Sequence, residues 1–154
     1  MTRTKSLIAI VEDDEPSRKA LGRLLCSAGM DVTCFPSGVE FLESLTTEWP
    51  DCVVLDLQMP VMNGFEVQAR LAELRVSVPV VIITGHDCDE TRALALAGFP
   101  VAYLRKPVND QLLLDAIALG LRRSQQQLGD RNDDSLNAHQ RGTGDDCNGK
   151  STEI

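Results

Sequence analysis

Short apolar runs alternate with segments of helical periodicity along the first 123 residues. The runs lie at 5–11, 31–35, 52–55, 78–85 and 101–104, with a composition typical of strands. After each run, apolar side chains recur every three or four residues, as on the buried face of a helix. The pattern therefore predicts five strands alternating with five helices.

Capping and turn residues mark where these helices begin and end. Small polar side chains accept hydrogen bonds from the first turn of a helix, proline suits that turn, and glycine suits the residue after the last turn. Such signals mark helix starts at Pro16, Ser37, Asn63 and Asn109, and helix ends at Gly29, Pro50 and Gly98. The segments between the runs are therefore predicted to be helices of ordinary length.

Alternation of strands and helices predicts an α/β fold with a parallel sheet and helices on both faces. Right-handed crossovers leave few topologies, and the order 2-1-3-4-5 is a common one for five strands. We therefore expect a (βα)5 fold, a doubly wound parallel five-stranded sheet of the flavodoxin-like type. One domain over residues 1–123 accounts for all of these elements.

The last part of the chain has a different composition. From residue 124 on, Gln, Asp, Asn, Gly and Ser dominate, and large apolar residues are few. Such a segment cannot offset its ordering entropy by burying apolar surface. Residues 124–154 are therefore predicted to be a polar, disordered C-terminal tail.

Charge and cysteine usage narrow the function classes. The formal net charge of −8 argues against a nucleic-acid or anionic membrane surface as a partner. No apolar run has the length of a membrane span or a signal core, so we expect a cytoplasmic protein. The cysteines lack C-x-x-C spacing, which argues against a metal–thiolate site, and Cys34 and Cys52 are predicted to be buried strand residues.

Polar side chains stand where four of the predicted strands end. Glu12 and Asp13 follow the first strand, Asp56 the third, Thr84 ends the fourth, and Lys106 follows the fifth. These ends would converge beside the first strand, where open parallel sheets place their ligands. Converging carboxylates repel one another, which either raised pKa values or a bound cation can relieve, and an all-oxygen set suits Mg²⁺. A carboxylate beside Mg²⁺ and a lysine can act as a nucleophile towards a phosphoryl group.

Four segments together resemble the receiver domains of two-component response regulators, of the chemotaxis-regulator type. They are V-E-D-D-E-P-S-R (11–18), V-V-L-D-L-Q-M-P-V-M-N-G (53–64), V-V-I-I-T-G-H (80–86) and A-Y-L-R-K-P (102–107). The resemblance covers residues 6 to about 123. The last two segments look most like receivers of the nitrogen-fixation type, which usually carry a C-terminal DNA-binding domain. The tail is too short and polar for such a domain, so we expect a stand-alone receiver.

The resemblance implies which residues carry the chemistry. Asp56 would be the phosphoacceptor, and Mg²⁺ would be bound by Glu12, Asp13, Asp56 and the main-chain carbonyl of Gln58. Thr84 would be the switch hydroxyl that contacts the phosphoryl group.

The resemblance also implies roles around the phosphoacceptor. Lys106 would bind the phosphoryl group, and the Lys106–Pro107 peptide bond would be cis. Tyr103 would be the aromatic residue that changes rotamer on activation, although a tyrosine at the core edge explains it equally well. Gln58 and His86 would tune the lifetime of the phosphoryl group.

The function implied is that of a single-domain response regulator. A sensor histidine kinase would transfer a phosphoryl group to Asp56. The face formed by the fourth helix, fifth strand and fifth helix would then signal by protein–protein contact or phosphorelay, with dimerisation on phosphorylation as one form of that contact. The protein would not be an enzyme beyond catalysing its own phosphorylation and slow dephosphorylation.

Two other function classes fit the same residues. A phosphohydrolase with an aspartyl-phosphate intermediate typically has a second Asp two residues after the nucleophile, where this chain has Gln58, which cannot act as a general acid. A phosphorylation-independent interaction module would keep the fold and leave Asp56 silent. Turnover of a phosphate ester would indicate the first alternative, and lack of Mg²⁺ binding the second.

Overall fold

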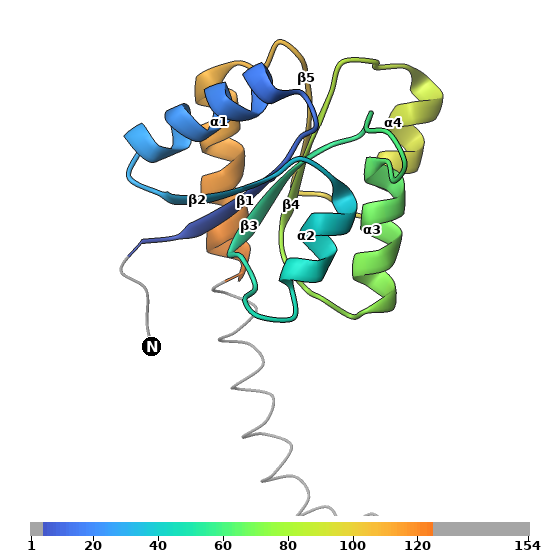
Figure 1. The fold of residues 1–154 in the computed structure, drawn as a ribbon. Coiled ribbons are helices and arrows are strands. Elements are labelled where there is room, and N and C mark those ends of the chain that lie inside the picture. Colours follow the sequence, from blue (N-terminus) through green and yellow to red (C-terminus); the bar gives the residue numbers. More distant parts are fainter. Residues whose placement is uncertain (1–4, 125–154) are drawn as a thin grey trace, which may run out of the picture. The chain divides into compact units, whose positions relative to one another are not determined.

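The computed structural model describes residues 5–124, and those up to residue 121 belong to one compact unit (Figure 1). The strands are β1 (Leu7–Val11), β2 (Asp31–Phe35), β3 (Cys52–Asp56), β4 (Val80–Thr84) and β5 (Ala102–Arg105). The helices are α1 (Glu15–Ser27), α2 (Gly38–Ser44), α3 (Gly64–Glu73), α4 (Asp89–Leu96) and a last helix that occupies residues 110–124. The predicted tail lies outside the described residues, apart from residue 124.

The strands form one parallel sheet in the order β2-β1-β3-β4-β5, which confirms the predicted topology. Val11 pairs with Leu55, and Asp56 pairs with Ile83 on the next strand. Because every neighbouring pair is parallel, all strands end at the same edge of the sheet.

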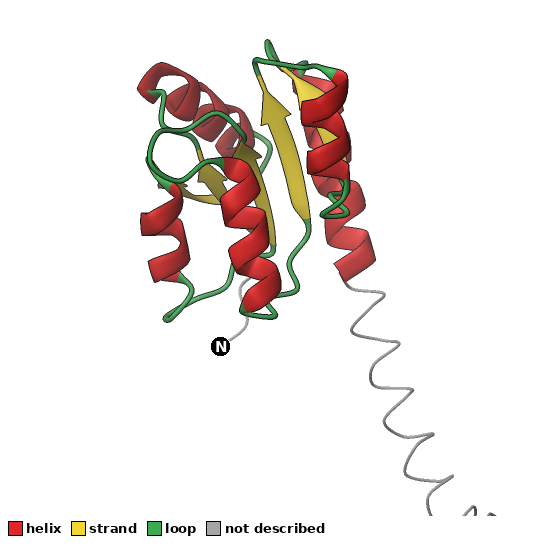
Figure 2. Ribbon diagram, turned by 90° about the vertical axis from the view of Figure 1, so that its right-hand side faces the viewer, coloured by secondary structure: helices red, strands yellow, loops and turns green. Residues whose placement is uncertain are grey.

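Helices cover both faces of the sheet (Figures 1 and 2). One face packs against α1 and the last helix through a cluster that includes Ile10, Leu25, Val54 and Ile117. The other face packs against α2, α3 and α4 through a cluster of alternate strand residues and helix residues. Consecutive residues of β3 therefore face opposite helical layers, which explains why its apolar run is uninterrupted.

Predicted capping residues hold the helix starts. The side chains of Ser37 and Asn63 accept hydrogen bonds from main-chain N–H groups at the starts of α2 and α3. Asn109 does the same for the last helix, at 2.9 Å. These caps fix where the loops after the strands give way to helix.

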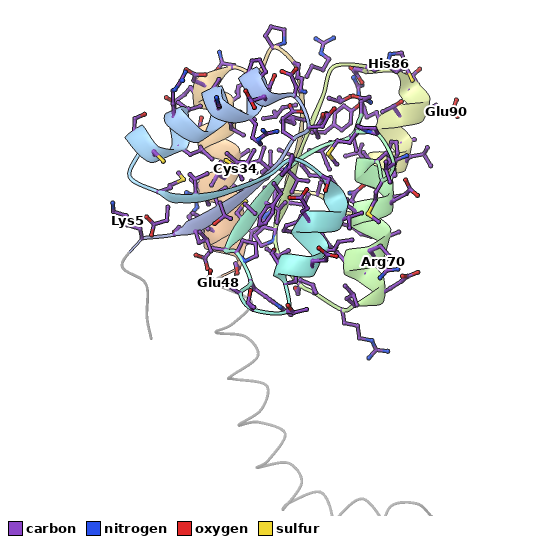
Figure 3. All side chains as sticks on the ribbon, viewed as in Figure 1. Lys5, Cys34, Glu48, Arg70, His86 and Glu90 are labelled. Atoms are coloured by element: carbon purple, nitrogen blue, oxygen red, sulfur yellow. The ribbon has the colours of Figure 1, made fainter. Side chains whose placement is uncertain are left out.

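The prediction for Cys34 was wrong. Cys52 on β3 is buried, whereas Cys34 on β2 is exposed (Figure 3). β2 has one neighbouring strand only, at the edge of the sheet, and none of its residues is fully buried. The predicted order 2-1-3-4-5 already places this strand at the edge, but the prediction for Cys34 took only the apolar run at 31–35 into account.

Candidate functional site

The polar residues that end β1, β3 and β4 lie within the protein at the carboxyl edge of the sheet. Glu12, Asp56 and Thr84 have exposed fractions of 0%, 2% and 0%. The burial of the two carboxyl groups is unusual, because acidic residues are rarely buried unless they are paired or bind a metal. Asp13, the next residue after Glu12, is exposed and gives the site a side open to solvent.

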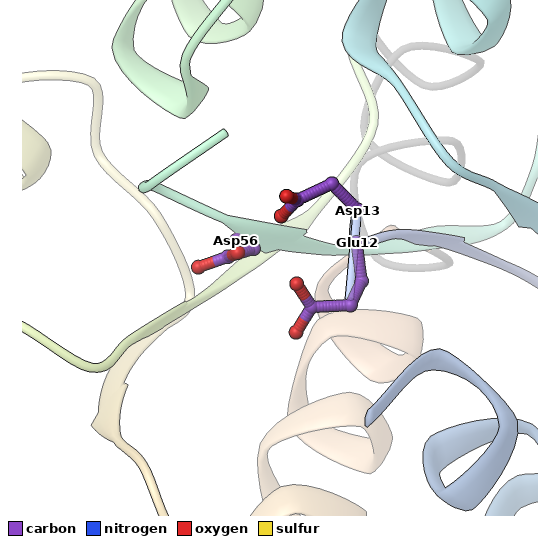
Figure 4. A group of neighbouring side chains, drawn as sticks. All are labelled: Glu12, Asp13 and Asp56. Carbon is purple, nitrogen blue, oxygen red and sulfur yellow. The ribbon is translucent and has the colours of Figure 1, made fainter. Parts of the chain in front are cut away.

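Glu12, Asp13 and Asp56 form an acidic cluster (Figure 4). One carboxylate oxygen from each residue lies within 4.8 Å of the others. Oxygen ligands at this spacing, with one side open to water, fit a small hard cation such as Mg²⁺. The sequence prediction that these three side chains converge is therefore consistent with the geometry, while the role of the Gln58 carbonyl stays a prediction.

Lys106 supplies the positive charge of the cluster. Its Nζ lies 2.6 Å from Glu12 Oε1 and 3.5 Å from Asp56 Oδ2. Burial opposes the charge of the ammonium, but the hydrogen bond to Glu12 and the charge of Asp56 raise the pKa of Lys106 above its ordinary value. Lys106 therefore stays protonated and neutralises part of the acidic cluster.

Asp56 is the carboxyl group whose ionisation is most affected by this arrangement. Burial, followed by hydrogen bonding and charge from the Glu12 carboxyl, raises the pKa of Asp56 to about 7, although Lys106 acts in the opposite direction. The ordinary value is 3.8. A cation bound by the cluster would favour the ionised, nucleophilic form of Asp56.

Thr84 is engaged by the side chain of Gln58. The Thr84 hydroxyl donates to Gln58 Oε1 at 2.7 Å, and the Gly85 main-chain N–H donates to the same oxygen at 3.2 Å. The Gln58 main-chain N–H in turn donates to Asp56 Oδ1 at 3.3 Å. The side-chain oxygen of Gln58 therefore accepts hydrogen bonds from both the Thr84 hydroxyl and the Gly85 N–H.

The loop after β3 brings the start of α3 against the phosphoacceptor candidate. The Gly64 N–H donates to the Leu57 carbonyl at 3.0 Å. A Cβ atom at position 64 would lie 2.7 Å from the Asp56 carbonyl oxygen and 2.8 Å from Leu57 Cα. Both contacts are with main-chain atoms, so this approach requires glycine.

Tyr103 belongs to a second polar group that the sequence did not reveal. Its hydroxyl donates to Asp87 Oδ1 at 3.0 Å, and Arg92 pairs with Asp87 at 2.6 Å. The Arg92 guanidinium also lies over the Tyr103 ring, 5.7 Å from its centroid. Burial, with the hydrogen bond and charge of Asp87, raises the pKa of Tyr103 to about 12. Asp87 follows no recognisable motif, so only the structure identifies it.

The remaining predicted site residues lie around the cluster. The Lys106–Pro107 peptide bond is cis. The His86 side chain is exposed at the periphery (Figure 3), while its main-chain N–H donates to Thr84 Oγ1 at 3.1 Å. A role for His86 or Gln58 in phosphoryl lifetime stays a prediction. Within residues 5–124, no helix is long and apolar enough to cross a bilayer.

Comparison with known proteins identifies the family. Residues 8–118 match the response regulator receiver domain. The chain is 36% identical to nodulation protein W of Bradyrhizobium diazoefficiens over 80% of this chain and 55% of that protein. It is 32% identical to the transcriptional regulatory protein FixJ of Rhizobium meliloti over 74% of this chain and 56% of that protein.

A solved structure gives the same result. The response regulator receiver protein from Burkholderia phymatum is 45% identical, with a TM-score of 0.68, over 76% of this chain and 95% of that one. The chain spans just over half the length of the curated relatives named above. The match to the family over most of the chain, together with the acidic cluster at the carboxyl edge of a 2-1-3-4-5 sheet, shows that this chain belongs to the response regulator receiver domains of two-component signalling.

Proposed function

We propose that Asp56 accepts a phosphoryl group from a sensor histidine kinase in a Mg²⁺-dependent reaction. One observation carries the proposal: the buried Asp56 carboxylate lies in a cluster with Glu12 and Asp13, and the Lys106 ammonium lies 2.6 Å from Glu12 and 3.5 Å from Asp56. A doubly charged cation would complement the charge of the carboxylates, and the lysine ammonium would complement the negative charge of a phosphoryl group.

Each residue of the site would have a separate role in the phosphoryl transfer. A carboxylate oxygen of Asp56 attacks the phosphorus of a phosphohistidine, the phosphorus–nitrogen bond breaks, and the imidazole nitrogen keeps the bonding electron pair. Mg²⁺, held by Glu12, Asp13 and Asp56, would neutralise negative charge on the transferred group. The Lys106 ammonium offers a second positive charge to the same oxygens. The Thr84 hydroxyl becomes their donor once it leaves Gln58.

The switch would then act on the face formed by α4, β5 and the last helix. A hollow of about 520 Å³ on this face is lined by Thr84, Asp87, Arg105, Lys106 and Leu112, among others. The hollow is therefore lined both by Thr84, the switch residue, and by Leu112 on the last helix, which a partner would contact. Movement of Thr84 towards a phosphoryl group changes this hollow, which links the charge on Asp56 to a protein-binding surface.

The proposal also includes where the protein acts and how it signals. We place it in the cytoplasm, where sensor kinases present their phosphohistidine, and expect signalling by protein contact or phosphorelay, with dimerisation as one form of it. The protein would act on no separate substrate and would catalyse only its own phosphorylation and slow dephosphorylation. The stand-alone arrangement stays a prediction, because the relatives named above are longer than this chain.

The test is phosphorylation by a radiolabelled small phosphodonor such as acetyl phosphate, with Mg²⁺ or with a chelator. We expect stoichiometric, Mg²⁺-dependent label that is lost in Asp56→Asn and kept in Asp31→Asn, a matched change at an exposed aspartate. Release of phosphate far beyond one equivalent would indicate a phosphohydrolase. Absence of label in a folded protein would indicate a phosphorylation-independent interaction module.

A further inference from the structure

We propose that Arg18 is a positioning residue for the cation site. Its guanidinium holds the main chain of the loop between β1 and α1, so that the Glu12 and Asp13 side chains converge on Asp56. The inference rests on the proposed function in one respect, because it takes the acidic cluster to bind a divalent cation.

The contacts of Arg18 are with the main chain of the two residues that supply the acidic pair. Its Nη1 donates to the carbonyl oxygen of Glu12 at 2.9 Å and to that of Asp13 at 3.3 Å. Its Nη2 lies 3.9 Å from a carboxylate oxygen of Glu15. The Arg18 side chain is 17% exposed, against 61% for Lys19, the next residue of α1. Arg18 therefore lies over the loop instead of extending into solvent.

These contacts fix a short loop at the point where its direction matters. The Glu12 main-chain N–H is held by the Phe35 carbonyl at 3.1 Å, and Asp14 begins α1 by accepting from the Ser17 N–H at 3.0 Å. Between those anchors, Arg18 binds the carbonyls of both Glu12 and Asp13. A main chain fixed on both sides of each residue limits where its carboxylate can point, and contacts behind the ligands of a metal set its affinity.

If Arg18 acted only through its positive charge, it would weaken cation binding instead of supporting it. A guanidinium close to a cation site repels the cation, so removing its charge should strengthen cation binding if charge were its main influence. Loss of a positioning contact should weaken binding. A purely structural role on α1 would lower the free energy of unfolding and leave the affinity of the folded protein unchanged. The sign of the change in affinity therefore separates the three cases.

The experiment measures Mn²⁺ binding to the full chain by electron paramagnetic resonance of the free ion, without any phosphodonor. Arg18→Met removes the charge and the donors but keeps a long side chain, whereas Arg18→Lys keeps the charge and one donor group. Arg23→Met is the matched control, because Arg23 is exposed on the same helix. Urea unfolding of the metal-free proteins reports their stability separately.

We expect Arg18→Met to raise the Mn²⁺ dissociation constant by about tenfold, Arg18→Lys to raise it less, and Arg23→Met to leave it unchanged. Equal or tighter binding by Arg18→Met overturns the inference while leaving the proposed function intact. If Arg18→Met does not fold, Arg18→Lys decides the question, and parent-like binding by Arg18→Lys overturns the inference. Failure of the parent protein to bind Mn²⁺ overturns the proposed function, and the inference with it.

Discussion

At the scale of single residues, the central feature is a carboxyl group buried beside another one. Burial and Glu12 raise the pKa of Asp56 from 3.8 to about 7. The folded protein therefore holds the Asp56 proton more tightly than the unfolded chain does. It follows that Asp56 lowers the stability of the metal-free protein as pH rises from about 4 to about 7.

We expect Asp56→Asn to stabilise the metal-free protein at about pH 8, because an amide keeps the shape of the carboxyl group without its charge. The gain in unfolding free energy should be on the order of 2 kcal/mol and should vanish near pH 4, where Asp56 is protonated in both states. Urea unfolding at several pH values measures it. A gain of equal size at all pH values, or the same gain in the control Asp31→Asn, would contradict the assignment of the effect to Asp56 ionisation.

Gln58 offers a second test at this scale. Its Oε1 accepts from the Thr84 hydroxyl and the Gly85 N–H, two donors at the end of β4, the strand next to the one that ends in Asp56. Removing that competitor should favour a phosphoryl-like ligand by about 1 kcal/mol, so we expect Gln58→Ala to bind beryllium trifluoride about fivefold more tightly in the presence of Mg²⁺. Titration followed by fluorine NMR measures the affinity. Unchanged or weaker binding, or an equal gain in the control Gln111→Ala, would show that Gln58 does not compete for these donors.

The charged residues of the site could be predicted from the sequence, but the hydrogen bonds around them could not. Glu12, Asp13, Asp56 and Lys106 each follow a strand, and parallel strands bring such positions together. Hydrogen bonds such as Gln58 to Thr84, or Arg18 to the loop carbonyls, depend on side-chain rotamers and on main-chain direction. Neither is encoded in a spacing, so these contacts could not be predicted.

At the scale of elements, the site depends on how closely α3 approaches the end of β3. A Cβ atom at position 64 would meet main-chain atoms at 2.7 and 2.8 Å, so the helix would have to move. We expect Gly64→Ala to lower the free energy of unfolding by about 2 kcal/mol. Urea unfolding measures this, and a parent-like stability of Gly64→Ala would contradict the close approach.

Gly22→Ala is the matched control, within α1. Its added Cβ would meet only Cys34 Sγ, at an ordinary 3.7 Å. Alanine is the better helix former, so this change should stabilise the protein by up to about 1 kcal/mol.

Element positions were more predictable than element environments. The strand 31–35 was predicted with the same bounds as β2, and Ser37 was correctly identified as the cap of α2. Hydrophobic period and capping chemistry are local, so the sequence displays them directly. The exposure of Cys34 was missed because its burial was predicted from the local apolar run, whereas exposure follows from the edge position that the predicted strand order gives to β2.

At the scale of the whole molecule, Asp87 joins the loop after β4 to β5 through Tyr103. Tyr103 is the sole tyrosine of the chain, so phenolate absorbance reports its ionisation directly. We expect Asp87→Asn to lower the pKa of Tyr103 from about 12, because the hydrogen-bonded carboxylate contributes to the rise. Asp89→Asn, an exposed change two residues away, should leave the pKa much closer to the parent value. An unchanged titration in Asp87→Asn would show that burial alone sets it.

The fold and the family were within reach of the sequence because several signals agreed. Five apolar runs, alternating helices and four strand-end motifs all indicate one topology, which the order β2-β1-β3-β4-β5 confirms. The binding partner and the signalling output, in contrast, could not be predicted from the sequence. They depend on surfaces such as the hollow beside Thr84 and Leu112, whose form comes from packing between distant segments.

The most direct measurement is the identity of the side chain that carries the phosphoryl group. After reaction with acetyl phosphate and Mg²⁺, borohydride reduces an aspartyl phosphate to homoserine, and peptide mass spectrometry locates the modified residue. We expect the modification at position 56 alone, dependent on Mg²⁺ and absent from Asp56→Asn. Modification at Asp13 or elsewhere, or none in a folded and Mg²⁺-bound protein, would contradict the assignment of Asp56 as the phosphoacceptor.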